Sequence, residues 1–171
     1  MKYVLIMLLL SGCVTTGSPE AVFDRYLNAY GNGNAQEMWD LSAPNVHKET
    51  KVLQARFLEA LRHPDPAQRI PVEGTFGVTA EIIESMDTRT FFHWVIHAIR
   101  RQLGSSTIRN AVAGMQRLTL LSMGPNHVQI VYRGMDEREH RLHLQRSDKG
   151  WLVQDNPFFP KAPVTTDTNS Q

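Results

Sequence analysis

His127-Val128-Gln129-Ile130-Val131-Tyr132-Arg133 places Val128, Ile130 and Tyr132 at every second position. A period of two is typical of a β-strand that turns one face toward a core. Three other segments, 117–123, 139–146 and 151–155, have similar alternation, and turn-forming residues separate the four at 124–126, 134–137 and 147–150. The chain from residue 116 onward is therefore expected to form a meander of four antiparallel strands with one buried face.

Upstream of this region the apolar residues recur at helical spacing. The first helix is expected to begin at Pro19, with Ser18 as its N-cap. Its buried arc should comprise Val22, Phe23, Tyr26, Leu27, Ala29 and Tyr30. Further helices are expected over 35–41, 49–62, 80–85 and 88–103. Pro44 is expected to stop the second helix, 69–77 to be irregular, and 105–114 to be either helix or loop.

Helices first and a meander last predict an α+β domain, with the N-terminal helices packed on a C-terminal antiparallel sheet. The two helices joined by a Gly/Asn turn and the closing Trp-x-Val-x-Asp resemble the NTF2-like fold. The residues that carry this resemblance lie in 18–30, in 33–41 and in Gly150-Trp151-Leu152-Val153-Gln154-Asp155. The resemblance implies a curved sheet that wraps around the first helix and leaves a cone-shaped pocket. A different α+β domain is the alternative.

A second pattern lies at the N-terminus, where Leu10-Ser11-Gly12-Cys13 closes an apolar run that follows Lys2. It resembles the lipobox of bacterial lipoproteins, and seven apolar residues are too few to span a bilayer. The resemblance implies a signal peptide over 1–12, acylation of Cys13 with chains such as palmitate, and a lipidated tether over 13–17. The domain would then occupy 18–160, with a disordered tail over 161–171. The alternative is a frayed apolar N-terminus.

The lipobox resemblance also implies a location and explains the cysteine content. Because Val14 and not an aspartate follows Cys13, the protein is expected at the outer membrane of the bacterial cell envelope, facing the periplasm. Cys13 is the only cysteine, so acylation would leave the exported domain without a disulfide or a thiolate site. The 18 basic and 17 acidic residues nearly balance, which argues against a nucleic-acid partner.

Few residues could carry chemistry. Enzymes with an NTF2-like fold place an acid or base and often a tyrosine inside the cone, and the candidates here are Tyr26, Tyr30, Asp40, Tyr132 and His140. His93 and His97 are four apart on an expected helix and could hold a metal. They share an arc with Arg89, Arg100 and Arg101, so this arc is more simply a solvated basic face, or a surface that lies against anionic lipid headgroups. No metal or cofactor is expected.

These observations favour a membrane-anchored, non-catalytic binding or accessory module. Its expected partners are the lipid bilayer through acylated Cys13, and either a small apolar ligand or another envelope protein. The alternatives are a small enzyme of the dehydratase or isomerase type that works in the cone, and a structural interaction module that forms homodimers.

Overall fold

The computed structural model describes residues 17–134 and 136–158. Cys13, the expected signal peptide and the expected tail over 161–171 lie outside these residues. The elements are α1 (Pro19–Asn32), α2 (Ala35–Asp40), α3 (Pro44–Leu61), α4 (Pro66–Phe76), α5 (Ala80–Glu84), α6 (Thr88–Leu103), α7 (Ser105–Ala113), β1 (Gln116–Gly124), β2 (His127–Arg133), β3 (Glu139–Ser147) and β4 (Gly150–Val153). The α+β class is confirmed: the helices come first, and a four-stranded sheet follows them.

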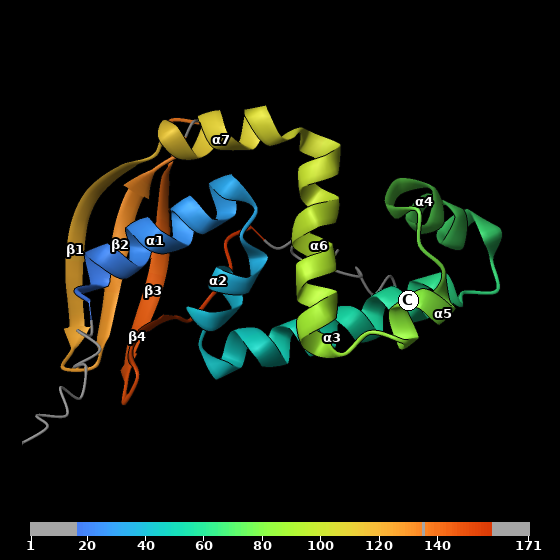
Figure 1. Cartoon of the computed structure of the whole chain (residues 1–171), viewed down its shortest axis with the longest axis horizontal. Helices are drawn as coiled ribbons and strands as arrows, with labels where there is room; N and C mark the ends of the chain where they lie inside the picture. Colours follow the sequence, from blue (N-terminus) through green and yellow to red (C-terminus); the bar gives the residue numbers. More distant parts are fainter. Residues whose placement is uncertain (1–16, 135, 159–171) are drawn as a thin grey trace, which may run out of the picture.

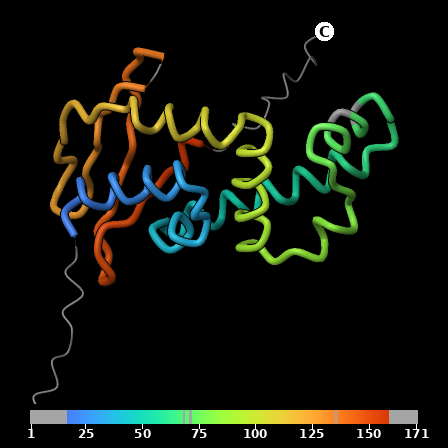
Figure 2. Tube along the Cα trace, turned by 45° about the horizontal axis from the view of Figure 1, so that its top comes forward, coloured from blue at the N-terminus to red at the C-terminus, as the bar shows by residue number. Residues whose placement is uncertain are grey.

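The sheet is the expected antiparallel meander, with the strands in the order β1-β2-β3-β4. Helix α1 packs across one face of this sheet, and α7 lies alongside α1 (Figure 1). After α2 the chain leaves the sheet. Helices α4 and α5 lie on the far side of α6 from the strands, and α3 runs from α2 past α6 to reach them (Figures 1 and 2). Helices α3 to α6 are called the helical arm below.

The apolar residues divide into two clusters that follow this arrangement. The main cluster fills the space between α1, α2, α7 and the sheet, and includes all six residues of the expected α1 arc. The second cluster lies in the helical arm, where Leu61, Val78, Ile83, Phe91 and Val95 are buried. Helix α6 contributes to both clusters, because Phe92 and Ile96 belong to the first and Phe91 and Val95 to the second.

The hydrogen bonds at the start of the chain explain how α1 and α2 form. The hydroxyl of Ser18 accepts a hydrogen bond from the backbone N–H of Ala21 at 3.3 Å, as expected of an N-cap. Gly33 ends α1 in the left-handed conformation, at φ 76°. Asn34 then caps α2: its Oδ1 accepts from the N–H of Glu37, and its Nδ2 donates to the Glu37 carboxylate, both at 3.2 Å.

Three expectations about the helices that follow α2 were wrong or left open. Pro44 does not only end α2; it occupies the first turn of α3, where proline costs no hydrogen bond, so α3 begins five residues earlier than expected. The segment 69–77 is not irregular but belongs to α4. The carboxylate of Asp65 caps α4 by accepting from the N–H of Ala67 at 2.9 Å, and Gly77 ends it at φ 60°. Residues 105–113 are helical.

The expectation of a single buried face also needs correction at β2. Val128, Ile130 and Tyr132 face the main cluster as expected, but Gln129 and Val131 on the opposite face are each only 6% exposed. They lie on the second strand of the sheet, where Leu121 and His143 flank Gln129 in register. Side chains from the neighbouring strands therefore cover a face that no helix covers.

Candidate functional site

A pocket of about 440 Å³ opens where the start of α1, the α2–α3 connection and the β3–β4 hairpin meet. Gly17, Val22 and Arg25 form one side of it. Residues 39–42, 44 and 47 form the second side, and the hairpin residues 147–152 form the third. The hairpin docks here through backbone pairing: the N–H of Ala43 donates to the carbonyl of Val153 at 2.7 Å, and the N–H of Val153 donates to the carbonyl of Leu41 at 2.8 Å.

Three aromatic side chains, Trp39, His47 and Trp151, line this pocket and are called its aromatic floor below. The ring of His47 stacks on the indole of Trp39, with centroids 3.8 Å apart and planes 15° apart, and the Nε2 of His47 lies 3.3 Å from the Trp39 carbonyl oxygen. Phe92 meets Trp39 edge-on at 5.3 Å. Trp39 and Trp151 are partly buried, and both pack against the main cluster. The aromatic floor is therefore held rigidly by the core.

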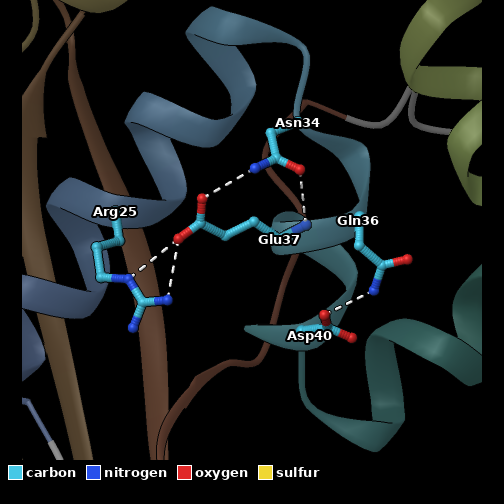
Figure 3. Close-up of polar contacts among 5 residues, drawn as sticks. All are labelled: Arg25, Asn34, Gln36, Glu37 and Asp40. Atoms are coloured by element: carbon cyan, nitrogen blue, oxygen red, sulfur yellow. Dashed lines mark hydrogen bonds and ion pairs between the residues drawn. The ribbon is translucent and has the colours of Figure 1, made fainter.

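Charged groups surround this aromatic floor, and two of them are held by ion pairs, of which Figure 3 shows the one between Arg25 and Glu37. Arg25 reaches from α1 to the Glu37 carboxylate on α2, with its Nη2 2.9 Å and its Nε 3.1 Å from the same oxygen. Asp40 accepts from the Gln36 amide at 2.6 Å and pairs with Arg89 at 3.2 Å. Asp148 and Lys149 line the pocket from the hairpin turn. The four lining groups, Arg25, Lys149, Asp40 and Asp148, balance in formal charge.

Three of the five predicted cavity residues lie in the core and do not line this pocket. Tyr26 is fully buried, and Tyr30 and Tyr132 are 6% and 3% exposed. Phe158 stacks on Tyr30 at 3.7 Å and lies 6.2 Å from the ring of Tyr26. Aromatic side chains thus fill the space between α1 and the sheet, where the NTF2-like resemblance implied an open cone.

The environment of these tyrosines keeps their hydroxyls protonated. The hydroxyl of Tyr26 is buried beside that of Ser42, which donates its own proton to the Met38 carbonyl at 2.7 Å. Burial raises the pKa of Tyr26 far above its usual value, and it raises the pKa of Tyr132 to about 12. Neither group is prepared to act as a base near neutral pH.

The other two predicted cavity residues are solvent-accessible. His140 stacks on Tyr132 at 5.5 Å, and its Nε2 lies 2.9 Å from the carboxylate of Asp136, a residue that the sequence did not single out. The hydrogen bond to His140 lowers the pKa of Asp136. Both side chains of this pair are nearly half exposed, with Asp136 on the β2–β3 loop and His140 at the start of β3. Asp40 alone of the five predicted residues lines the pocket.

The predicted metal candidates lie on α6 beside α2. The Nε2 of His93 is buried without a hydrogen-bond partner in the part of the chain that the structure describes, while His97 is exposed. Burial, and then the nearby charge of Arg89, lower the pKa of His93. Among residues 17–134 and 136–158, no three His, Cys, Asp or Glu side chains gather as metal ligands.

The expected basic face around these histidines is only partly correct. Arg100 is buried, and its Nη1 donates to the carbonyl oxygens of Tyr30 and Gly31 at 2.6 and 2.9 Å. A guanidinium that caps the C-terminus of α1 is neither solvated nor free to meet a lipid headgroup. Arg89 pairs with Asp40, and Arg101 remains exposed.

A polar row on the open face of the sheet was also missed. The Asp155 carboxylate lies 3.0 Å from Nδ1 of His143 and accepts from the His143 backbone N–H at 2.9 Å, while Nε2 of His143 contacts the Gln129 amide at 2.6 Å. The carboxylate caps the edge of β3 just beyond the end of its pairing with β4. The row lines no part of the pocket at the β3–β4 hairpin.

Comparison with other proteins adds no relative to this picture. No protein-family model matches the chain, and no curated protein or solved structure matches it. Within the described residues, no helix has the length and apolar character needed to cross a membrane. Trp39, His47 and Trp151, which the sequence did not single out as site residues, are identified as pocket residues by their geometry alone. Two of them were already among the residues of the NTF2-like resemblance.

Proposed function

We propose that this protein is a bacterial envelope lipoprotein, held at the outer membrane by acyl chains on Cys13, whose periplasmic domain binds a ligand without transforming it. The lipobox-like stretch 10–13 supports the anchor, and acylation explains why the chain has a single cysteine. Two or three acyl chains hold a protein firmly at a bilayer, whereas one does so only marginally.

The binding role rests on one observation: the chain keeps an open, aromatic-floored pocket while its interior is filled. A pocket of about 440 Å³ lies within the range of roughly 300–1,000 Å³ that is usual for small-molecule sites. Its floor carries Trp39, His47 and Trp151. The tyrosines that a catalytic cone would present are packed in the core instead.

The NTF2-like assignment of the domain is part of this proposal. It is supported by α1 packed across an antiparallel meander, by the Gly33-Asn34 turn into α2, and by the pairing of the chain after α2 with β4. In this interpretation the helical arm from α3 to α6 is an elaboration of the fold. Because side chains fill the interior, the ligand would bind at the rim of the domain and not inside the cone.

The rival proposal, an enzyme, would need an acid or base with a tyrosine in an enclosed pocket. His140, Asp136 and Tyr132 do lie together, but the side chains of His140 and Asp136 are nearly half exposed and form no enclosed pocket with the buried Tyr132. The other rival, an interaction module, is favoured by three exposed apolar residues of β1: Leu118, Leu121 and Met123 are 40%, 42% and 63% exposed. A second copy of the chain is the partner that this alternative would predict.

The anchor is tested by Cys13→Ser in cells. The variant should retain its signal peptide, incorporate no labelled palmitate and move from the detergent phase to the aqueous phase when the lysate is partitioned. Normal detergent partition of the Cys13→Ser protein would refute the lipoprotein assignment.

The binding role is tested on the full-length acylated protein in a zwitterionic detergent, with nicotinamide as a planar, uncharged and water-soluble probe. Nicotinamide should quench the tryptophan emission saturably, at one molecule per chain, and Trp151→Ala should abolish the saturable part. Trp94 lies in the second cluster, against Phe57 and Phe91, so Trp94→Phe is the matched control and should bind normally. Quenching that is only linear, or equal in Trp151→Ala, would contradict a binding pocket here.

A further inference from the structure

We propose that the pocket at the rim of the domain takes a saccharide, one or two polyhydroxylated rings, as its ligand. This inference rests on the proposed function, because it names the chemical class of ligand for the same pocket. Three observations support it. The lining has a rigid aromatic floor and a balanced set of charged groups, and the pocket lies near the proposed anchor.

The aromatic floor provides the apolar half of a sugar site. A pyranose ring has one face made mostly of C–H groups, which packs on the face of an indole and buries apolar area. Two of the three tryptophans of the chain, Trp39 and Trp151, line this pocket. Because Trp39 is stacked on His47 and buttressed by Phe92, a ligand does not have to immobilise it, so little conformational entropy is lost on binding.

The charged groups provide the polar half. The lining contains two cations, Arg25 and Lys149, and two carboxylates, Asp40 and Asp148. This balance gives no net attraction to a strongly anionic or cationic ligand. It does place donors beside acceptors, and a sugar hydroxyl donates one hydrogen bond and accepts others, so neighbouring hydroxyls can use both kinds of group.

The ion pairs orient two of these groups while leaving hydrogen-bonding capacity. Arg25 binds Glu37 through Nε and Nη2, so its Nη1 takes no part in that pair (Figure 3). Asp40 meets Arg89 through Oδ1 and Gln36 through Oδ2, and each carboxylate oxygen can accept a further hydrogen bond. Arg25 and Asp40 are therefore held in place but can still form hydrogen bonds, which suits a ligand with many hydroxyls.

The position of the pocket links it to the envelope. Gly17 lines the pocket, and it follows Cys13 by four Cα-to-Cα steps along the chain. An extended chain spans at most about 3.6 Å per residue, so the proposed anchor lies within about 14 Å of Gly17. The saccharide could then come from a free sugar in the periplasm or from the glycan strands of the cell wall, and both share the chemistry that the pocket would recognise.

The test is a titration of the full-length acylated protein in lauryldimethylamine oxide, a detergent without a sugar headgroup. Tri-N-acetylchitotriose and purified glycan strands are added separately, and binding is followed by tryptophan fluorescence and calorimetry. At least one should bind saturably, and Trp151→Ala should weaken that binding by about tenfold or more, as expected for a central aromatic contact. The control Trp94→Phe should bind like the wild-type protein.

Each outcome has a defined meaning. Binding of the trisaccharide alone indicates a free sugar, and binding of the strands indicates the cell wall. The saccharide proposal is overturned if neither the trisaccharide nor the glycan strands bind saturably, or if Trp151→Ala binds with the same affinity as the wild-type protein. If nicotinamide still binds in that case, the binding role stands and only the ligand class fails. Should Trp151→Ala not fold by circular dichroism, Lys149→Ala at the exposed hairpin turn replaces it, and it should weaken binding at least threefold.

Discussion

At the residue scale, the side chain whose role differs most from expectation is Arg100. Its position on α6 among other basic residues suggested a solvated face, yet it is only 9% exposed. Its guanidinium satisfies two carbonyl oxygens at the C-terminus of α1, where the helix dipole favours a cation. The atoms of the guanidinium also lie against Gly33, where an added Cβ would come within 2.6 Å of Nε. Arg100 therefore joins the helical arm to the main core.

Arg100→Met should lower the free energy of unfolding by about 2–4 kcal/mol. It keeps the apolar stem but leaves the Tyr30 and Gly31 carbonyls without their charged donor. Chemical denaturation measures the loss. The matched control is Arg101→Met on the same helix, which is exposed and should change stability by no more than about 0.5 kcal/mol. Equal effects of the two substitutions would show that Arg100 contributes no specific hydrogen bonds.

His93 should make stability fall in mild acid. Its pKa in the folded protein is lowered from 6.5, mainly by burial, so the unfolded chain binds the proton more readily. Stability is then complete above about pH 6.5 and is lost as the pH falls through the lowered pKa. Denaturation between pH 7.5 and pH 5 should therefore show a smaller loss in His93→Gln than in the wild-type protein. The control, His97→Gln, should follow the wild-type pH dependence, and parallel curves for all three proteins would contradict the assignment.

At the element scale, α4 shows how short signals set the limits of a helix. Asp65 caps its start, Pro66 occupies the first turn and Gly77 ends it, although 69–77 contains no strong apolar period. None of the α4 side chains that the structure describes is completely buried, and the helix rests on α3. Caps and glycines therefore decide where this element begins and ends, more than packing does.

Gly74→Ala and Gly77→Ala should change stability in opposite directions. Gly74 lies within α4, and nothing lies within 4 Å of an added Cβ, so alanine should stabilise the protein by about 0.5–1 kcal/mol. Gly77 has the same open surroundings but φ 60°, so alanine there should cost about 1 kcal/mol or more. Thermal unfolding measures both. A stabilising Gly77→Ala would mean that α4 does not end at this residue.

At the scale of the whole molecule, the two apolar clusters meet along α6. Phe91 and Phe92 are neighbours in sequence and fully buried, but they serve different clusters. Phe91 lies 5.7 Å from Phe57 in the arm, and Phe92 lies 5.3 Å from Trp39 beneath the pocket. The arm can therefore be weakened without removing a side chain from the sheet cluster.

Phe91→Ala should cost about 3–5 kcal/mol through the cavity it leaves. Native-state hydrogen exchange should show the largest acceleration in α4 and α5, with amides of β2 less affected. Phe92→Ala is the matched variant, and it should accelerate exchange in β2 as well as in α6. If Phe91→Ala accelerated β2 and α5 equally, the two clusters would form one cooperative unit.

The sequence by itself determined the local structure that short-range physics controls. The period of two from residue 117 to 155 predicted the meander, and the Ser18 cap located the start of α1, because a cap satisfies N–H groups within the first turn of its own helix. The arc of α1 was also predictable, since all six apolar residues lie on one side of a helix. Asp65, Pro66 and Gly77 are signals of the same kind for α4, but the weak apolar period between them does not predict a helix.

Only the tertiary structure decided which residues share a site. Trp151 is far in sequence from Trp39 and His47, and the three residues line one pocket because the β3–β4 hairpin pairs with the chain that follows α2. The same packing places Tyr26, Tyr30 and Tyr132 in the core, and Arg100 beneath α1. Whether a tyrosine or arginine side chain is buried depends on neighbours that distant elements contribute. Periodicity along one helix or strand carries no information about those neighbours.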